Sequence, residues 1–141
     1  MISIDKQSFK GRRAIIRVDF NVPMDSNKNV LDNSRIKAAK STILKVIKDG
    51  GSVILMSHLG RPNGKEESCS LRHVLNETQK VLGLNVLFAG DALGQKTEDL
   101  ISALRPGQVL LLENLRFYPE ETSGDEMFAK KLASYADCYI N

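Results

Sequence analysis

Five short runs rich in β-branched and aliphatic residues alternate with longer segments of helical periodicity along the whole sequence. The runs cover residues 14–19, 52–57, 85–88, 109–112 and 137–140. The runs 52–57, 85–88 and 109–112 are almost continuously apolar, as expected of strands that helices cover on both faces. The alternation predicts an α/β fold, a Rossmann-like open parallel sheet with helices on both faces.

Four helices are predicted between these strands. The first begins at one of the capping residues 32–34 and ends at the glycine pair 50–51. The second is capped by Ser70 and stops at Gly83, and the third runs from about Thr97 to the break at 105–107. The fourth opens at 124–126 and buries Phe128, Leu132 and Ala136.

Composition fits one soluble domain with an ordinary core. The chain has 141 residues, 42% hydrophobic and 26% charged, and its net charge of +3 includes no basic run. These values predict neither a nucleic acid nor a membrane partner. With no membrane-length apolar stretch and no leader peptide, we expect a cytoplasmic protein. Cys69 and Cys138 have no zinc-site spacing, so free thiols and no metal site are expected.

Polar and charged residues follow three of the predicted strands. Asp19 and Asn21 come after the first, His58 and Arg61 after the second, and Arg116 after the fourth. We call these five residues the strand-end cluster. Because ligands of open α/β sheets bind beyond the carboxyl ends of the strands, the cluster predicts a site for a compact polyanion.

Each member of the strand-end cluster also has a simpler explanation when it is taken alone. Either arginine could be a solvated loop residue, His58 a capping or packing histidine, and Asp19 and Asn21 turn formers. The convergence of all five at three strand ends favours the anion site. Arg35 adds a weaker hint, because a cation in the first turn of a helix opposes the helix dipole unless an anion lies there; Arg72 is placed similarly without such a reason.

Other phosphate-binding and hydrolytic motifs fail. Residues 60–65 look like a Walker A loop, but three residues separate the glycines instead of four, and Glu66 takes the place of the magnesium-binding hydroxyl. No GxGxxG follows the first strand and no GxSxG elbow is present. The chain therefore carries no sequence signature of a P-loop, a dinucleotide site or a serine hydrolase.

Four segments, in order, match the motifs of one enzyme family. They are residues 17–23 (RVDFNVP), 34–39 (SRIKAA), 57–62 (SHLGRP) and 113–117 (ENLRF). Together they closely resemble the N-terminal domain of the phosphoglycerate kinase family. The resemblance implies two α/β domains of similar size, the first binding 3-phosphoglycerate or 1,3-bisphosphoglycerate and the second binding Mg-ADP or Mg-ATP.

The resemblance also implies a role for each matching residue. Asp19 and Asn21 would hold the hydroxyl side of the glycerate. Its phosphate would be bound by Arg61 and Arg116.

Three further residues take roles from the same resemblance. Arg17 and His58 would belong to the surrounding basic patch. Arg35 would be the catalytic residue, which meets the carboxylate or acyl phosphate and stabilises the transferring phosphoryl group.

Residues 1–141 are then expected to be an incomplete N-terminal domain of a two-domain kinase, with the nucleotide domain absent. Alone, the chain should bind no cofactor or metal and be inactive, and its last strand should leave an unpaired edge that favours self-association; the parent enzyme is expected to be a monomer. The alternative hypothesis is a non-catalytic anion-binding or interaction module. The coding sequence after Asn141 would distinguish the two.

Overall fold

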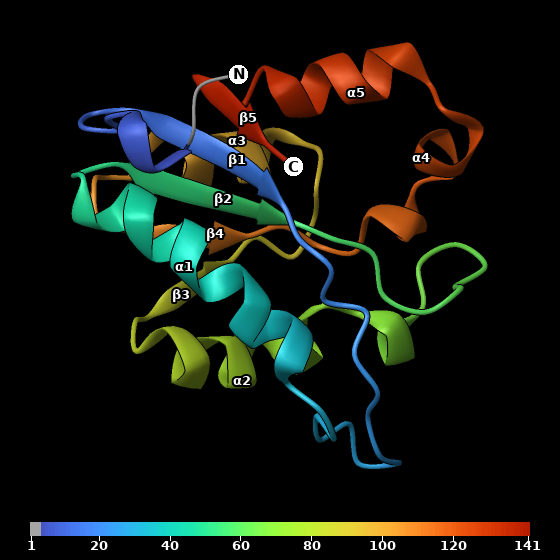
Figure 1. Cartoon of the computed structure of the whole chain (residues 1–141). Helices are drawn as coiled ribbons and strands as arrows, with labels where there is room; N and C mark the ends of the chain where they lie inside the picture. The colour runs from blue at the N-terminus through green and yellow to red at the C-terminus, as the bar shows by residue number, and fades with distance from the viewer. Residues whose placement is uncertain (1–3) are drawn as a thin grey trace.

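A parallel five-stranded sheet forms the centre of the computed structural model, which describes residues 4–141 (Figure 1). The strand order is β3-β4-β2-β1-β5, and every neighbouring pair is parallel. The strands are β1 (Arg13–Arg17), β2 (Ser52–Met56), β3 (Val86–Phe88), β4 (Val109–Leu111) and β5 (Cys138–Ile140). The predicted fold class, an open parallel α/β sheet, is confirmed.

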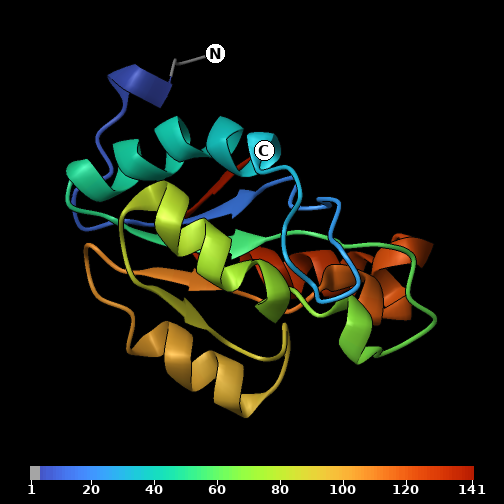
Figure 2. The ribbon, with the colours of Figure 1, turned by 90° about the horizontal axis from the view of Figure 1, so that it is seen from below.

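Helices cover both faces because successive strand residues point to opposite sides. Ala14 and Ile16 of β1 join the core beneath α1 (Ser34–Lys48) and α2 (Arg72–Leu82), which lie in front of the strands in Figure 2. Ile15 points into a second core with α3 (Gln95–Ser102) and α5 (Glu126–Ala133). The remaining elements are α4 (Pro119–Ser123) and the 3-10 turns η1 (Ile4–Lys6), η2 (Glu67–Cys69) and η3 (Leu115–Phe117).

The first two strands end earlier than predicted, at points where side-chain hydrogen bonds replace the backbone hydrogen bonds between strands. The first strand ends at Arg17 and the second at Met56, two residues and one residue earlier than expected. Ser57 leaves the ladder because its hydroxyl accepts the Phe20 amide at 2.9 Å and donates to the His58 carbonyl at 2.9 Å. The strands therefore stop just before the residues that form the strand-end cluster.

Two helix predictions also need correction. The second helix begins at Arg72 with Leu71 at its N-cap position, one residue after the predicted cap Ser70, whose hydroxyl nevertheless accepts the Arg72 amide at 3.2 Å. The fourth predicted helix is shorter than expected, running from Glu126 to Ala133 behind the Asp125 cap, and the short helix α4 before it was not anticipated. No helix within residues 4–141 has the length and apolar character needed to cross a membrane.

The amino ends of the strands are closed by tight backbone packing. A Cβ on Gly51 would lie 2.7 Å from the Phe9 carbonyl oxygen and 2.8 Å from that of Arg12. The Gly51 carbonyl also accepts the Gly107 amide at 2.8 Å. This end of the sheet leaves no room for a side chain at residue 51, and it lies opposite the strand-end cluster.

Candidate functional site

The strand order makes the predicted strand-end cluster contiguous. β1, β2 and β4 are consecutive in the sheet and parallel, so the segments that follow them lie at the same edge (Figure 1). Asp19 and Asn21 follow β1, His58 and Arg61 follow β2, and Arg116 lies in η3 after β4. The structure therefore brings together the three segments that the sequence predicted to converge.

Arg35, at the start of α1, is joined to the segment after β1. Its guanidinium Nη1 donates to the Asn21 carbonyl oxygen at 2.5 Å and lies 3.4 Å from Asp19 Oδ1. Asp19 Oδ1 also accepts the Asn21 amide at 3.2 Å. The Arg35 side chain is 51% exposed, so this guanidinium lies at the surface with a carboxylate beside it and can still meet an anion from solvent.

The Asn21 side chain links two loops of the site. Its Oδ1 accepts the Gly60 amide at 2.9 Å. The chain reverses at Gly60, where φ is +64°, a value that glycine adopts without strain. The loops after β1 and β2 are thus held together directly beside Arg61.

Arg17 has a partner that sequence reasoning missed. Its Nη2 lies 2.6 Å from Glu121 Oε1 in α4, and both side chains are partly buried. The two residues are 104 positions apart, and α4 itself was not predicted, so no local signal could have paired them. The positive charge of Arg17 is therefore partly neutralised within the molecule.

His58 lies among four charged groups at the same edge. Burial lowers the pKa of His58, and the guanidinium groups of Arg116 and Arg17 lower it further, while Asp19 and Glu121 act in the opposite direction. The imidazole is therefore neutral at pH 7. Burial is the main cause of the lowered pKa, and the nearby arginines add to it.

Arg61 and Arg116 carry the charges available to a ligand. Arg61 is exposed in the loop after β2, and Arg116 is half-buried in η3. Across residues 4–141, neither guanidinium forms an ion pair with a carboxylate. Two uncompensated guanidinium groups in adjacent strand-end loops suit a phosphate group, whose oxygens accept paired N–H donors.

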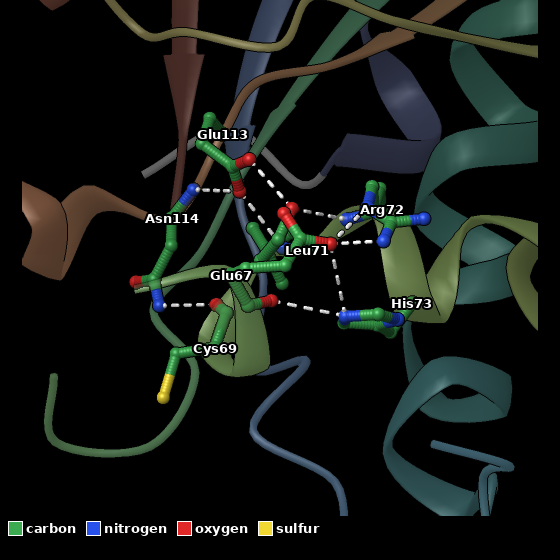
Figure 3. A network of polar contacts seen from close by, with 8 residues as sticks. Glu67, Cys69, Leu71, Arg72, His73, Glu113 and Asn114 are labelled. Carbon is green, nitrogen blue, oxygen red and sulfur yellow. Dashed lines mark hydrogen bonds and ion pairs between the residues drawn. The ribbon is translucent and has the colours of Figure 1, made fainter. Parts of the chain in front are cut away.

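Arg72, the other cation in a first helical turn, is explained by its own neighbours. It forms an ion pair with Glu67 of η2, and that pairing lowers the pKa of the Glu67 carboxyl (Figure 3). His73 Nε2 approaches the Glu67 carbonyl at 3.0 Å. These contacts fasten η2 to α2 and lie outside the strand-end cluster.

A buried polar pair that follows β4, Glu113 and Asn114, holds residues 69–71, at the junction of η2 and α2, by hydrogen bonds. Glu113 is 4% exposed and accepts from the Ser70 hydroxyl at 2.6 Å and from the Leu71 amide at 2.8 Å (Figure 3). Asn114, with no exposed surface, donates to the Cys69 carbonyl at 2.8 Å. Sequence reasoning placed both residues in a motif but assigned neither a role.

The remaining candidate chemistry in the described part of the chain is sparse. Cys69 and Cys138 are both free and half-buried, and burial raises the pKa of the Cys138 thiol. Among residues 4–141, no three His, Cys, Asp or Glu side chains gather as a metal-binding group. The arginine-rich edge is therefore the feature that needs a functional explanation.

Comparison with known proteins gives a single family. The family model described as phosphoglycerate kinase matches residues 4–141. The chain is 44% identical to the phosphoglycerate kinase of Porphyromonas gingivalis over 99% of the chain and 39% of that relative. It is 46% identical to the cytosolic phosphoglycerate kinase of Nicotiana tabacum over 99% of the chain and 35% of that relative.

Solved structures agree with the sequence comparison. The crystal structure of phosphoglycerate kinase from Pyrococcus horikoshii OT3 matches 99% of the chain and 36% of that protein, with a TM-score of 0.85 and 27% identity. The enzyme from Coxiella burnetii matches 98% of the chain and 34% of that protein, with a TM-score of 0.83 and 32% identity. The chain spans between a third and two fifths of the length of these relatives, and it belongs to the phosphoglycerate kinase family.

Proposed function

We propose that this chain forms the 3-phosphoglycerate site of a phosphoglycerate kinase, which transfers a phosphoryl group between 1,3-bisphosphoglycerate and ADP. The observation that supports the proposal most directly is the pair of uncompensated guanidinium groups, Arg61 and Arg116, in adjacent strand-end loops. The substrate carries a phosphate at one end and a carboxylate or acyl phosphate at the other. Arg61 and Arg116 suit the phosphate end, and Arg35 suits the other end.

The proposed roles divide the site into a binding part and a reacting part. Arg61 and Arg116 bind the phosphate that does not react, while Asp19 and Asn21 bind the hydroxyl side of the glycerate. Hydrogen bonds to charged groups contribute about 1.5 to 3 kcal/mol each. Arg17 adds positive charge to the surrounding surface, although Glu121 moderates it, and the neutral imidazole of His58 lies in the same patch.

Arg35 is the residue we assign to the transferring phosphoryl group. Phosphoryl transfer passes through a loose transition state with charge on the equatorial oxygens, so the protein acts chiefly by positioning and by electrostatic stabilisation. No covalent nucleophile is needed. Arg35 is exposed and held by the Asn21 carbonyl, which fixes one side of its guanidinium and leaves the other N–H groups for phosphoryl oxygens.

The magnesium nucleotide needs donors that the described residues do not group together. Residues 4–141 contain no carboxylate cluster for the metal and the sequence has no P-loop. Under this proposal, Mg-ADP or Mg-ATP binds to another part of the kinase. The chain described here supplies the acceptor side of the reaction.

A hybrid enzyme tests the proposal. Residues 1–141 replace the matching segment of the Porphyromonas gingivalis kinase, and phosphoryl transfer from ATP to 3-phosphoglycerate is measured by a coupled assay. We expect saturable activity that depends on 3-phosphoglycerate. Calorimetric ATP binding serves as the folding control. A hybrid that binds ATP yet shows neither turnover nor 3-phosphoglycerate binding would contradict the proposal.

A further inference from the structure

One buried amide holds both loops that carry the two proposed phosphate-binding arginines. Asn114 Oδ1 accepts the Leu59 amide at 3.1 Å and the Arg116 amide at 3.0 Å. Asn114 Nδ2 donates to the Leu59 carbonyl at 2.7 Å and to the Cys69 carbonyl at 2.8 Å. Arg61 lies two residues after Leu59, and Arg116 two residues after Asn114, so one side chain fixes the backbone beside each arginine.

These four bonds use the full capacity of a carboxamide, which has two acceptor sites on its oxygen and two N–H donors. Turning the group over would set N–H donors against N–H donors and oxygen against carbonyl oxygens. Aspartate lacks the donors, leucine lacks both functions and glutamine adds a methylene to a fully buried site. The requirement for asparagine is therefore geometric.

Further hydrogen bonds on either side of the Asn114 contacts hold the loop after β2 in place. Asn21 Oδ1 holds the Gly60 amide from the β1 side, while Glu113 holds Ser70 and Leu71 just beyond Cys69 (Figure 3). Arg61 follows Gly60 directly and precedes Pro62, whose ring restricts the backbone of the residue before it to extended conformations. Little backbone freedom remains at Arg61.

We infer that Asn114 is a positioning residue that sets the separation of Arg61 and Arg116 so that the two bind one phosphate together. The inference rests on the proposed function, since it needs an anion at these arginines. Asn114 does not touch the substrate. Instead, it holds both loops in place before the anion binds. Binding then costs less conformational entropy than it would if the loops were mobile.

The test is a titration of the 141-residue chain with 3-phosphoglycerate at low salt, followed by NMR of the arginine side-chain Nε–H signals. In the unmodified chain, the signals of Arg61 and Arg116 should both shift with one dissociation constant. In Asn114→Leu, which has similar shape and no hydrogen-bonding group, we expect affinity to fall at least tenfold. One of the two arginine signals should also lose at least half of its saturating shift.

Val46→Ala is the matched control. Val46 is fully buried on α1 beside Gly51, at the opposite end of the sheet, so this change lowers stability without touching Asn114. Affinity and both saturating shifts should stay unchanged at a temperature where both variants are folded. If Asn114→Leu does not fold, Asn114→Ser, which is smaller and keeps a polar group, takes its place with the same expectation.

The outcomes separate the two claims. Both arginine signals shifting in the Asn114 variants as fully as in the unmodified chain, with unchanged affinity, would overturn the positioning role alone. Equal losses in Val46→Ala would also overturn it, because the effect would then follow stability. No saturable shift at either arginine in the unmodified chain would overturn the proposed function and the positioning role together.

Discussion

The amino ends and the carboxyl ends of the strands are packed differently. At the amino ends, the backbone is packed so closely that a Cβ on Gly51 would collide with the carbonyl oxygens of Phe9 and Arg12, in the segment that leads into β1. At the carboxyl ends, the buried side chains of Ser57 and Asn114 and the partly buried side chain of Asn21 bind the loop backbone instead. Side-chain anchoring leaves wider loops, whose remaining residues can present arginines to a ligand.

This difference predicts that stability and ligand binding depend on residues at opposite ends of the sheet. A change at the glycine-packed end should alter the free energy of unfolding and leave ligand binding intact. A change among the exposed arginines should do the reverse, because solvated charges contribute little to folding. Kinetic effects of the variants are measured in the hybrid enzyme.

Arg35→Ala should have the largest effect. Removing a group that stabilises developing charge in the transition state lowers kcat by roughly 10²-fold or more, about 2.7 to 4 kcal/mol. Steady-state kinetics of the hybrid enzyme measure this. Arg35→Lys should recover little, since an ammonium cannot reproduce the planar fork. If Arg35→Ala changes only the KM for 3-phosphoglycerate, Arg35 is a binding residue and has no special role in the transition state.

Gly51→Ala should cost about 3 kcal/mol of unfolding free energy, because the new methyl group meets two backbone oxygens that cannot move independently. Urea denaturation of the 141-residue chain measures the loss. Gly64→Ala is the comparison: a Cβ there meets nothing within 4 Å, so only the strain of a left-handed residue, about 1 to 2 kcal/mol, is expected. Equal losses at the two positions would contradict the packing explanation.

Arg61→Ala should raise the KM for 3-phosphoglycerate by about 10- to 100-fold, the equivalent of one charged hydrogen bond at 1.5 to 3 kcal/mol. Under the proposed function the kcat should change little, because the phosphate assigned to Arg61 does not react and is held equally in the ground and transition states. Arg105→Ala, at an exposed position before β4, is the matched control and should leave KM unchanged. A large fall in kcat for Arg61→Ala would assign it to the reacting end.

The smallest effect concerns pH. Because the folded protein lowers the pKa of His58, the unfolded chain binds this proton more readily, and stability falls as pH drops through the usual histidine value of about 6.5 toward the folded value. Denaturation midpoints between pH 7.5 and 5 should decline, and His58→Gln should flatten that decline. An unchanged slope in His58→Gln would show that other groups cause it.

The sequence was sufficient for the architecture because apolar runs and glycine stops are local signals. It was also sufficient for the convergence of Asp19, His58 and Arg116, because parallel strands place their carboxyl ends together. It was insufficient for α4, a five-residue polar helix whose sequence, PEETS, has no apolar stripe. The predicted strand ends at Asp19 and Ser57 were wrong. Apolar character does not reveal where side-chain hydrogen bonds replace the backbone hydrogen bonds between strands.

The contacts inside the site were the least predictable part. The pairing of Arg17 with Glu121 joins residues 104 positions apart, and no spacing rule covers that distance. In the sequence, Asn114 is one residue of a motif and has no assigned role, and only the folded structure shows its four hydrogen bonds to three other residues. Long-range hydrogen bonds form only once the fold brings distant residues together, so local sequence patterns do not reveal them.

The place of β1 between β2 and β5 also governs how the chain can fold as it is made. Residues 14–16 pair with 138–140, and the Arg13 amide is accepted by Asp137, 124 positions away. At synthesis rates of about 5 to 20 residues per second, β1 waits roughly 6 to 25 s on the ribosome for its second partner. During that interval one edge of β1 stays unpaired, and this side of the sheet can form only after residues 138–140 leave the exit tunnel.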